Sequence, residues 1–376
     1  MSNHRLENPE EMKQIDKSGM LKFCLNMSKH YREAAKLAAG ITTSYAKPQN
    51  IIIVGMGGSA IGGELLKDWA RDKIHVPIEV NREYHLPTYA NKETLVLITS
   101  CTGNTEEILS TLLDAIKNKC RIYCLTCGGA LVEIAKSLNI PYLRIPAGMP
   151  PRATLPYMLI SLLTFLEKVE LTSGFSRELE EALPIVEKIE KQNAAETTVK
   201  DSLTKTLAIN IEGYIPVIYG FGIYSGVARR FKQQINENAK MMAKWDNFPE
   251  LDHNEIVGYE KVDKHKERFV TIFIRDKDEP IEMRNRIEIT QSLVKTTGVS
   301  IYEIWSQGKS DLAKMLSVIA TADFLSNYLA ILRGCDPTPV QTIDKLKDVL
   351  KKNCVKEHVV KEIEKITSVT ISQPQI

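Results

Sequence analysis

Short apolar runs separated by helical patterns fill the first half of the chain. The runs predict buried strands at 51–54, 78–80, 95–100 and 121–126, and the segment "YLRIP" closes the set. Helices are predicted at 8–45, at about 59–71, from "CTGNTEE" to about 118, at 130–138 and through "ATLPYMLISLLTFLEKV". Strands that alternate with helices form parallel sheets covered on both faces, so the pattern indicates an α/β fold.

The same pattern restarts after a stretch rich in Glu, Lys and Ala. "IPVIYGFGIYSGVARRF" aligns with "NIIIVGMGGSAIGGELL", with Gly220 on Gly55 and Gly222 on Gly57. Strands at 268–276 and 299–305 follow, and a long apolar helix closes the second half. We therefore expect two similar units in tandem. The expected segments are an N-terminal helical segment (1–45), a first domain (46–171), a helical connector (172–205), a second domain (206–350) and a C-terminal tail (351–376).

Charge and composition argue against a nucleic-acid-binding, membrane or secreted protein. The net charge is +2, from 49 basic and 47 acidic residues, which provides no broad electrostatic footprint for nucleic acid or a membrane surface. No run reaches 18 uninterrupted apolar residues, and the N-terminus lacks the apolar core of a secretory signal. We expect a cytoplasmic protein.

Seven cysteines over a long chain favour reduced thiols. Cys124 and Cys127 form a C-x-x-C, but no second ligand pair follows at zinc spacing. The segment also alternates like a strand, so a structural interpretation is favoured, with redox or metal chemistry as the alternative.

The first glycine turn, "GMGGSA", fits a dinucleotide fingerprint only in part, because Ala60 stands where the last glycine belongs. "SCTGNTEE" (100–107) supplies three hydroxyls at the end of a strand and the start of a helix, where backbone N–H groups favour an anion. The alternative is capping alone, by Thr105 or Asn104. Three hydroxyls without a P-loop lysine suit one phosphate monoester, which both loops could bind.

Three further residues carry candidate chemistry. Arg152 follows two prolines just before a helix, where it is placed to face an anion or developing negative charge; the alternatives are a surface arginine or an ion pair at the helix start. Glu237 lies on the helix after the second glycine turn and is a candidate base or a solvated side chain. His253 is a candidate acid–base group or a structural histidine, with Asp252 and its neighbours available to orient the ring. No strong metal-site spacing is present.

These motifs together carry a family resemblance. "GMGGSAIGG", "SCTGNTEE", "PPRATLPYM", "NEN…PELDHNEI" and "RGCDPTPVQTIDKLK" resemble, in this order over roughly residues 10–350, the archaeal and bacterial bifunctional phosphoglucose/phosphomannose isomerases. The resemblance implies two tandem sugar isomerase (SIS) domains, each a mainly parallel sheet flanked by helices. It also implies metal-independent and cofactor-free interconversion of glucose 6-phosphate or mannose 6-phosphate with fructose 6-phosphate.

The resemblance implies a set of site residues. The phosphate-binding positions are Gly58, Ser59, Ser100, Thr102 and Thr105. Thr102 departs from the family's S-x-S-G-N-T, in which a serine is expected, but it keeps the hydroxyl.

The resemblance also assigns the reacting groups. Arg152 matches the arginine that stabilises the enediolate, and Glu237 matches the base. His253 matches the residue that assists ring opening, from the partner subunit of a homodimer. A C-terminal lysine, Lys347 in preference to Lys345, acts with that histidine. The alternative function is a non-catalytic SIS regulator that binds sugar phosphates.

Overall fold

The computed structural model describes residues 2–262 and 266–372. The chain forms two compact units. The first-sheet unit consists of His30–Phe175 and the chain from Val340 onward, and the second-sheet unit consists of the chain up to Lys29 and Ser176–Pro339. Each unit is therefore discontinuous in the sequence.

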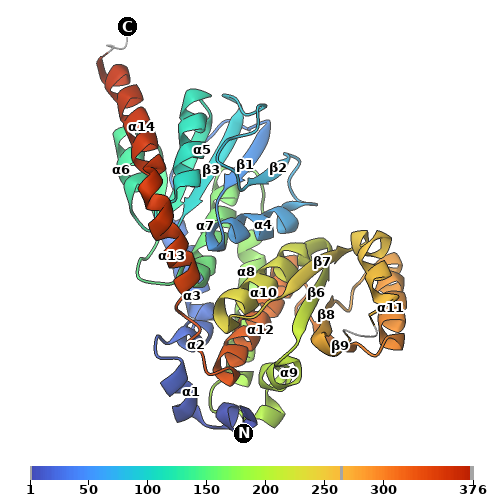
Figure 1. Ribbon diagram of the computed structural model, residues 1–376. Helices are drawn as coiled ribbons and strands as arrows, with labels where there is room; N and C mark the ends of the chain where they lie inside the picture. Colours follow the sequence, from blue (N-terminus) through green and yellow to red (C-terminus); the bar gives the residue numbers. More distant parts are fainter. Residues whose placement is uncertain (1, 263–265, 373–376) are drawn as a thin grey trace. The chain divides into compact units, whose positions relative to one another are not determined.

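The first sheet has the strand order β2-β1-β3-β4-β5, and all its neighbouring strands are parallel (Figure 1). Its strands are β1 (Asn50–Val54), β2 (Ile78–Asn81), β3 (Thr94–Ser100), β4 (Arg121–Thr126) and β5 (Tyr142–Arg144). Every residue of β3 is buried, as expected for a central parallel strand with helices on both faces.

The helices of this unit are α4 (Gly58–Ala70), α5 (Glu106–Lys117), α6 (Ala130–Ser137), η2 (Pro151–Thr154), α7 (Leu155–Lys168), α13 (Gln341–Leu350), η8 (Lys351–Asn353) and α14 (Val355–Ser372). Residues 351–376, expected only as a C-terminal tail, thus include a long helix. Val359 and Ile363 of α14 are buried in the core beneath α5 and α6, and Figure 1 shows α14 in red along these helices.

The second sheet has the order β7-β6-β8-β9 and is also parallel throughout. Its strands are β6 (Ile215–Phe221), β7 (Lys244–Phe248), β8 (Phe269–Arg275) and β9 (Ser300–Trp305). The sequence pattern did not predict β7, because this edge strand is half polar and carries no apolar run.

The helices of this unit are η1 (Ser2–Glu7), α1 (Pro9–Ile15), α2 (Met20–Cys24), η3 (Val199–Asp201), α9 (Leu203–Ile211), η4 (Gly222–Tyr224), α10 (Ser225–Ala239), η5 (Glu250–His253), η6 (Glu255–Tyr259), η7 (Lys266–Arg268), α11 (Ile281–Thr296) and α12 (Asp311–Leu332). Two further helices, α3 (Met27–Ala38) and α8 (Phe175–Gln192), carry the chain from one unit to the other. Among the described residues, α12 alone is long and apolar enough to span a membrane, and its apolar window is entirely buried, as in a core helix.

The expected single helix over 8–45 is broken where Asp16 caps a new helix. Its carboxylate accepts hydrogen bonds from the N–H groups of Met20 and Leu21 at 2.8 Å each, and Gly19 adopts a φ of +72°. A reversal of this kind at Gly19 requires a residue without a Cβ.

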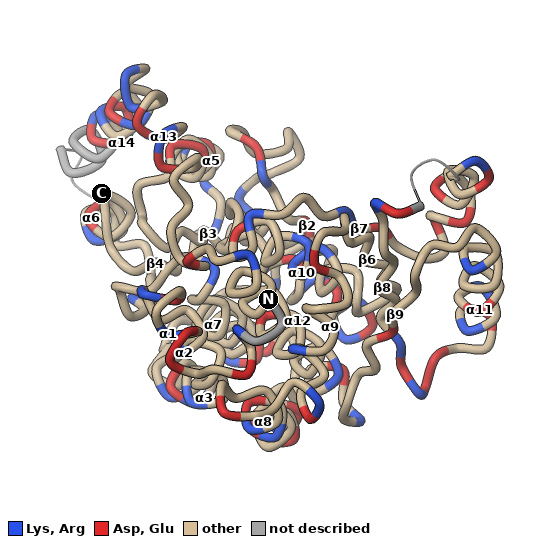
Figure 2. The backbone as a smooth tube through the Cα atoms, turned by 60° about the horizontal axis from the view of Figure 1, so that its bottom comes forward, with Lys and Arg blue, Asp and Glu red and all other residues tan. Residues whose placement is uncertain are grey.

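The prediction of an α/β fold with two parallel sheets is confirmed. Strands β6 to β9 repeat the order of β1 to β4, so β7 is the counterpart of β2. Figure 2 shows basic and acidic residues interspersed along surface helices such as α8 and α11, in keeping with the balanced net charge.

Candidate functional site

The candidate phosphate-binding loops meet at the switch point of the first sheet. From β1 the chain passes to β2 on one side, and β3 pairs with β1 on the other side. Ligands of open α/β sheets bind in the crevice that this reversal leaves at the carboxyl ends of the strands. The glycine turn follows β1 and "CTGNT" follows β3, so both loops border that crevice.

Two buried hydroxyls join the loops. Ser59 Oγ accepts a hydrogen bond from the Cys101 N–H at 3.2 Å. Thr99 Oγ1 donates to the Val54 carbonyl at 2.8 Å and to the Ser59 carbonyl at 3.2 Å. The glycine turn and the hydroxyl-rich loop therefore form one rigid structure, and the sequence analysis did not identify Thr99 as part of it.

The remaining hydroxyls lie within the second loop. Ser100 Oγ accepts from the Gly103 N–H at 3.1 Å and lies 3.4 Å from Thr105 Oγ1. Thr102 is exposed, and its Oγ1 accepts from the Asn104 N–H at 3.3 Å. The structure thus brings the hydroxyl-bearing residues predicted for phosphate binding onto one joined pair of loops.

Capping does not explain these hydroxyls. Thr105 is the N-cap residue of α5, but its side chain makes no capping hydrogen bond. Asn104 instead caps a different helix, since its Oδ1 accepts from the Ala130 N–H at the start of α6 at 3.2 Å. The alternative that Thr105 or Asn104 serves only to cap the helix that follows "SCTGNTEE" is therefore wrong.

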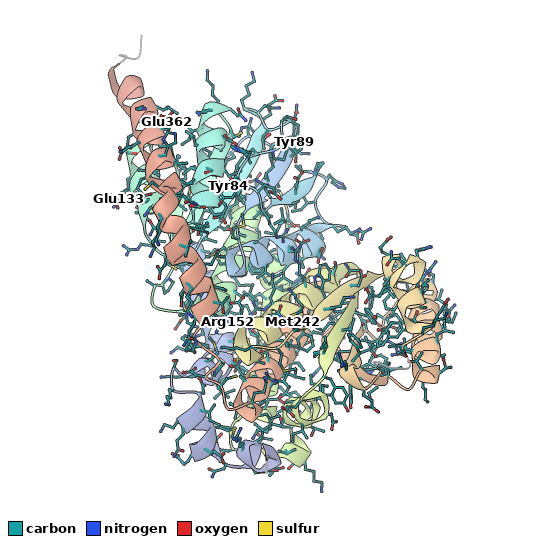
Figure 3. The ribbon with its side chains drawn as sticks, viewed as in Figure 1. Tyr84, Tyr89, Glu133, Arg152, Met242 and Glu362 are labelled. Atoms are coloured by element: carbon teal, nitrogen blue, oxygen red, sulfur yellow. The ribbon has the colours of Figure 1, made fainter. Side chains whose placement is uncertain are left out.

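The Arg152 turn packs directly on the first loop. A Cβ on Gly58 would lie 2.9 Å from the Pro151 carbonyl oxygen and 3.1 Å from the Arg152 nitrogen. Arg152 itself is buried, so the interpretation as a surface arginine is wrong (Figure 3). The two glycines of the partial fingerprint are needed by the loop itself, because Gly57 has a φ of +51° and a Cβ on Gly55 would lie 2.6 Å from Thr99 Oγ1.

Cys101 extends the site toward α13. The pKa of its thiol is lowered, first by a hydrogen bond with Cys127, against desolvation, and also by a hydrogen bond with Thr154 and by the charge of Lys347. Cys127 lies with its Sγ 3.2 Å from Cys101 Sγ. Its own pKa is raised, mainly by the hydrogen bond with Cys101. Lys347 is exposed on α13, and its charge acts on the Cys101 thiol.

Glu237 lies on α10 of the second-sheet unit and is half-buried. A ladder of buried polar groups fixes this helix against α12. Arg230 and Gln234 donate to the Asp323 carboxylate at 2.7 and 2.9 Å, and Asn238 donates to Ser326 Oγ at 2.9 Å. These residues recur every fourth position and hold α10 in place, which sequence reasoning had missed.

His253 ends the turn η5 and is exposed. Its neighbours do not orient the ring, contrary to expectation. The Asp252 carboxylate accepts from Arg286 at 3.0 Å and from Thr290 at 2.9 Å, both on α11. Glu255 accepts hydrogen bonds from Tyr219 and Lys244. These carboxylates hold the turn on its own unit and leave the imidazole toward solvent.

The switch point of the second sheet contains ion pairs where the first contains hydroxyls. Tyr224, after β6, donates to Asp276, after β8, at 2.6 Å and to Ser306 at 2.8 Å. Lys314 pairs with the same Asp276 at 3.1 Å and with Asp278 at 2.7 Å. A buried tyrosine and acidic side chains do not favour a phosphate, so the second switch point differs from the first in the chemistry it offers a ligand.

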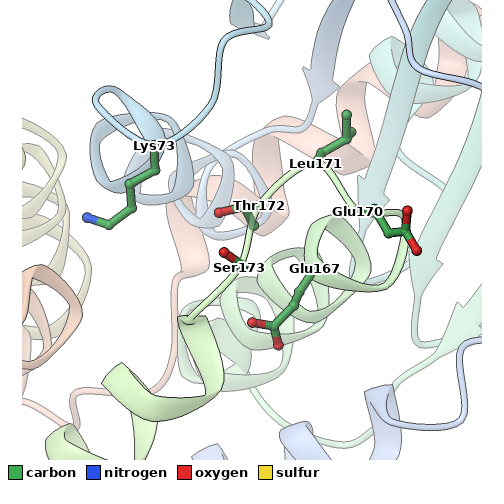
Figure 4. A pocket seen from close by; sticks show the side chains of 6 residues that line it. All are labelled: Lys73, Glu167, Glu170, Leu171, Thr172 and Ser173. Atoms are coloured by element: carbon green, nitrogen blue, oxygen red, sulfur yellow. The ribbon is translucent and has the colours of Figure 1, made fainter.

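A separate pocket of the first-sheet unit lies beyond the end of α7 (Figure 4). It is lined by Lys73, Glu167, Glu170, Leu171, Thr172 and Ser173. It shares no residue with the phosphate loops. Within residues 2–262 and 266–372, no three His, Cys, Asp or Glu side chains gather as metal ligands.

Comparison with known proteins decides the family. A bifunctional phosphoglucose/phosphomannose isomerase from Caldicellulosiruptor bescii is 36% identical over 334 residues, which cover 88% of this chain and 98% of that protein. The chain belongs to the bifunctional phosphoglucose/phosphomannose isomerase family. The family's enzyme from Aquifex aeolicus is 34% identical over 310 residues, 81% of this chain and 91% of that protein.

Two further comparisons support the fold of this family. Residues 200–350 match the family described as the bacterial phospho-glucose isomerase C-terminal SIS domain. A crystal structure of a glucose-6-phosphate isomerase from Chlamydia trachomatis superposes with a TM-score of 0.73 at 12% identity, covering 98% of this chain and 88% of that chain. The prediction of tandem SIS domains is thereby confirmed.

Proposed function

We propose that this member of the sugar-phosphate isomerase family interconverts both glucose 6-phosphate and mannose 6-phosphate with fructose 6-phosphate, through an enediolate and without a metal or cofactor. The observation that carries the proposal is the joined pair of loops at the first switch point. There, Ser59, Ser100, Thr102 and Thr105 bring hydroxyls to two helix N-termini whose N-cap residues make no side-chain capping bond. Helix N-termini favour a phosphate, because the helix dipole places partial positive charge there.

Arg152 is proposed to stabilise the enediolate. A carboxylate is too weak a base to remove a proton from a sugar carbon unless the resulting charge is stabilised. A guanidinium is always charged at neutral pH, and the turn that carries Arg152 is packed against Gly58 of the phosphate loop. Phosphate binding at one end of the sugar then orients the other end for reaction.

Glu237 is proposed to move a proton between C2 and C1. Its helix is fixed by the buried bonds of Arg230, Gln234 and Asn238 to α12, which suits a group that must be positioned accurately. His253 and Lys347 are proposed to assist ring opening at the ring oxygen. The exposed imidazole of His253 is consistent with our proposal that it reaches the active site of the partner in a homodimer.

The test is a rate measurement on both aldoses in the presence of EDTA. We expect turnover of glucose 6-phosphate and mannose 6-phosphate, and a loss of about 10²–10⁴-fold in both for Glu237→Gln. Glu282→Gln, on the surface of α11, is the matched control and keeps full activity. Loss of turnover on adding EDTA contradicts the metal-independent mechanism, as does a fully active Glu237→Gln.

The alternative is a regulator that binds sugar phosphates without converting them. The presence of Glu237, His253 and Arg152 together argues against it. A protein that binds fructose 6-phosphate in calorimetry and shows no isomerisation of either aldose would favour the regulator.

A further inference from the structure

Two thiols stand at the ends of neighbouring strands beside the phosphate loop. Ser100 of β3 and Thr126 of β4 are register partners, so Cys101 and Cys127 are the next residues of two parallel strands. The Cys127 N–H donates to the Cys101 carbonyl at 3.1 Å, which continues the ladder by one step. Neighbouring strands lie about 4.8 Å apart, within the Cα separation of about 4.4–6.8 Å that a disulfide spans.

The side chains already face each other. The two Sγ atoms are 3.2 Å apart, and a disulfide requires about 2.05 Å. Closing that gap needs rotation of the two side chains and little backbone movement. Cys124, the other member of the C-x-x-C, is wholly buried within β4, and Cys127 pairs with Cys101 instead.

The surroundings favour Cys101 as the attacking thiol. Lys347 and the Thr154 hydroxyl both favour its thiolate, whereas the thiol of Cys127 is held protonated by its bond to Cys101. Both residues are buried, and each keeps 8% of its surface exposed, which is the surface that a small oxidant would reach. A neighbouring cationic side chain, here Lys347, favours the reactive thiolate form of a cysteine.

We propose that Cys101 and Cys127 are a redox-sensitive pair, which a peroxide converts to a disulfide that alters the phosphate loop. The Cys101 thiolate attacks one peroxide oxygen, the O–O bond breaks, and the departing hydroxide takes a proton to become water. Cys127 sulfur then attacks the sulfenic acid, the S–O bond breaks, and a second water leaves as the disulfide forms. Two thiols lose two electrons and two protons, and one hydrogen peroxide is reduced to two waters.

The disulfide acts on the site through three contacts of Cys101. Its N–H donates a hydrogen bond to Ser59 Oγ, and its thiol is hydrogen-bonded to Thr154 in the turn that carries Arg152. Its neighbours in the chain are Ser100 and Thr102, both proposed to bind phosphate. Rotation of Cys101 toward Cys127 removes the thiol from Thr154. The effect on catalysis rests on the proposed function, whereas disulfide formation does not.

The test treats the reduced full-length protein with hydrogen peroxide, blocks the remaining thiols and maps the peptides without reduction. We expect a Cys101–Cys127 linkage, reversed by dithiothreitol, and slower formation when inorganic phosphate is bound. Because a displacement of about 1 Å can cost about 100-fold in rate, isomerase activity should fall at least about tenfold on oxidation and recover on reduction. Cys127→Ser should resist this loss, while Cys124→Ser should respond like the native protein.

Several outcomes would overturn the inference. These are a Cys124–Cys127 linkage, no linkage at all, or a Cys101–Cys127 linkage with unchanged turnover in an active enzyme. If the reduced protein isomerises neither aldose, the proposed function fails. The peptide map, and the rate of disulfide formation with and without inorganic phosphate, then still test whether Cys101 and Cys127 form a disulfide beside a phosphate-binding loop.

Discussion

At the residue scale, Gly58 lacks a side chain because the backbone of another turn fills the space that a Cβ would need. The carbonyl oxygen of Pro151 would lie 2.9 Å away, and a backbone atom cannot move aside as a flexible side chain can. This contact fixes the distance between the first loop and buried Arg152. Gly58 therefore positions the arginine, whatever its own N–H contributes to phosphate binding.

Replacing this glycine should displace the arginine. We expect Gly58→Ala to lower the free energy of unfolding by about 1–3 kcal/mol through overpacking, and to lower kcat about tenfold or more. Urea denaturation and the isomerase assay measure the two effects. Gly258→Ala is the control, since a Cβ there meets nothing within 4 Å. Equal behaviour of the two variants would refute the positioning role.

The sequence predicted which hydroxyl-bearing residues lie near one another, but it did not predict most of their contacts with other segments. It placed Ser59, Ser100 and Thr105 near one another because strands and loops of a parallel sheet end at a common edge. It did not predict that the Asp252 carboxylate accepts hydrogen bonds from side chains of α11, because these residues are more than thirty positions away in the sequence. The pairing of Cys127 with Cys101 instead of Cys124 depends on strand register in the same way.

At the element scale, the starts of α4 and α5 lack side-chain caps. Neither Gly57 nor Thr105 makes a side-chain capping bond. By contrast, Ser310 at the start of α12 accepts from the Ala313 N–H in the usual manner. We therefore expect different effects when the N-cap residue is replaced by alanine at a helix start with a side-chain cap and at one without.

Thr105→Ala should separate binding from capping. We expect its stability to stay within about 0.5 kcal/mol of the native protein, because no cap is lost, while KM for the sugar phosphate rises several-fold. Ser310→Ala should lose about 1 kcal/mol of stability with KM unchanged. Thermal or urea unfolding and initial rates provide the measurements. A Thr105→Ala variant that is destabilised with a native KM would restore the capping interpretation.

Elements with long apolar runs were the ones that the sequence predicted well. Strands β1, β3 and β4 are buried on both faces, so each has a continuous apolar run at its centre. Edge strand β7 reads "KWDNF" and owes its place to pairing with β6, which no local pattern shows. Even the recognised duplication did not predict it, because its residues do not resemble those of β2, the strand that stands at this place in the first copy.

At the scale of the whole molecule, two copies of one fold have taken different roles. The first switch point has a set of hydroxyls, and the second has Tyr224, Asp276 and Lys314 bonded to one another. Under the proposed function, the phosphate binds to loops of the first copy, and the proposed base Glu237 lies on α10 of the second copy.

Changes at the second switch point should therefore affect stability alone. Tyr224→Phe removes a buried donor to Asp276 and Ser306, and we expect a loss of about 1–2 kcal/mol of stability. KM for either aldose should stay within about twofold, because the phosphate binds elsewhere. Steady-state kinetics measures KM, and urea denaturation measures the free energy of unfolding. A KM raised tenfold with native stability would place the phosphate in the second copy.

The account depends on proton transfer through an enediolate, and isomerisation in heavy water tests this most directly. When glucose 6-phosphate is converted in ²H₂O with EDTA, we predict that deuterium from solvent appears at C1 of fructose 6-phosphate, and that Glu237→Gln abolishes both turnover and incorporation. Undiminished turnover and deuterium incorporation by Glu237→Gln would contradict the mechanism, because another group would then move the proton between C2 and C1.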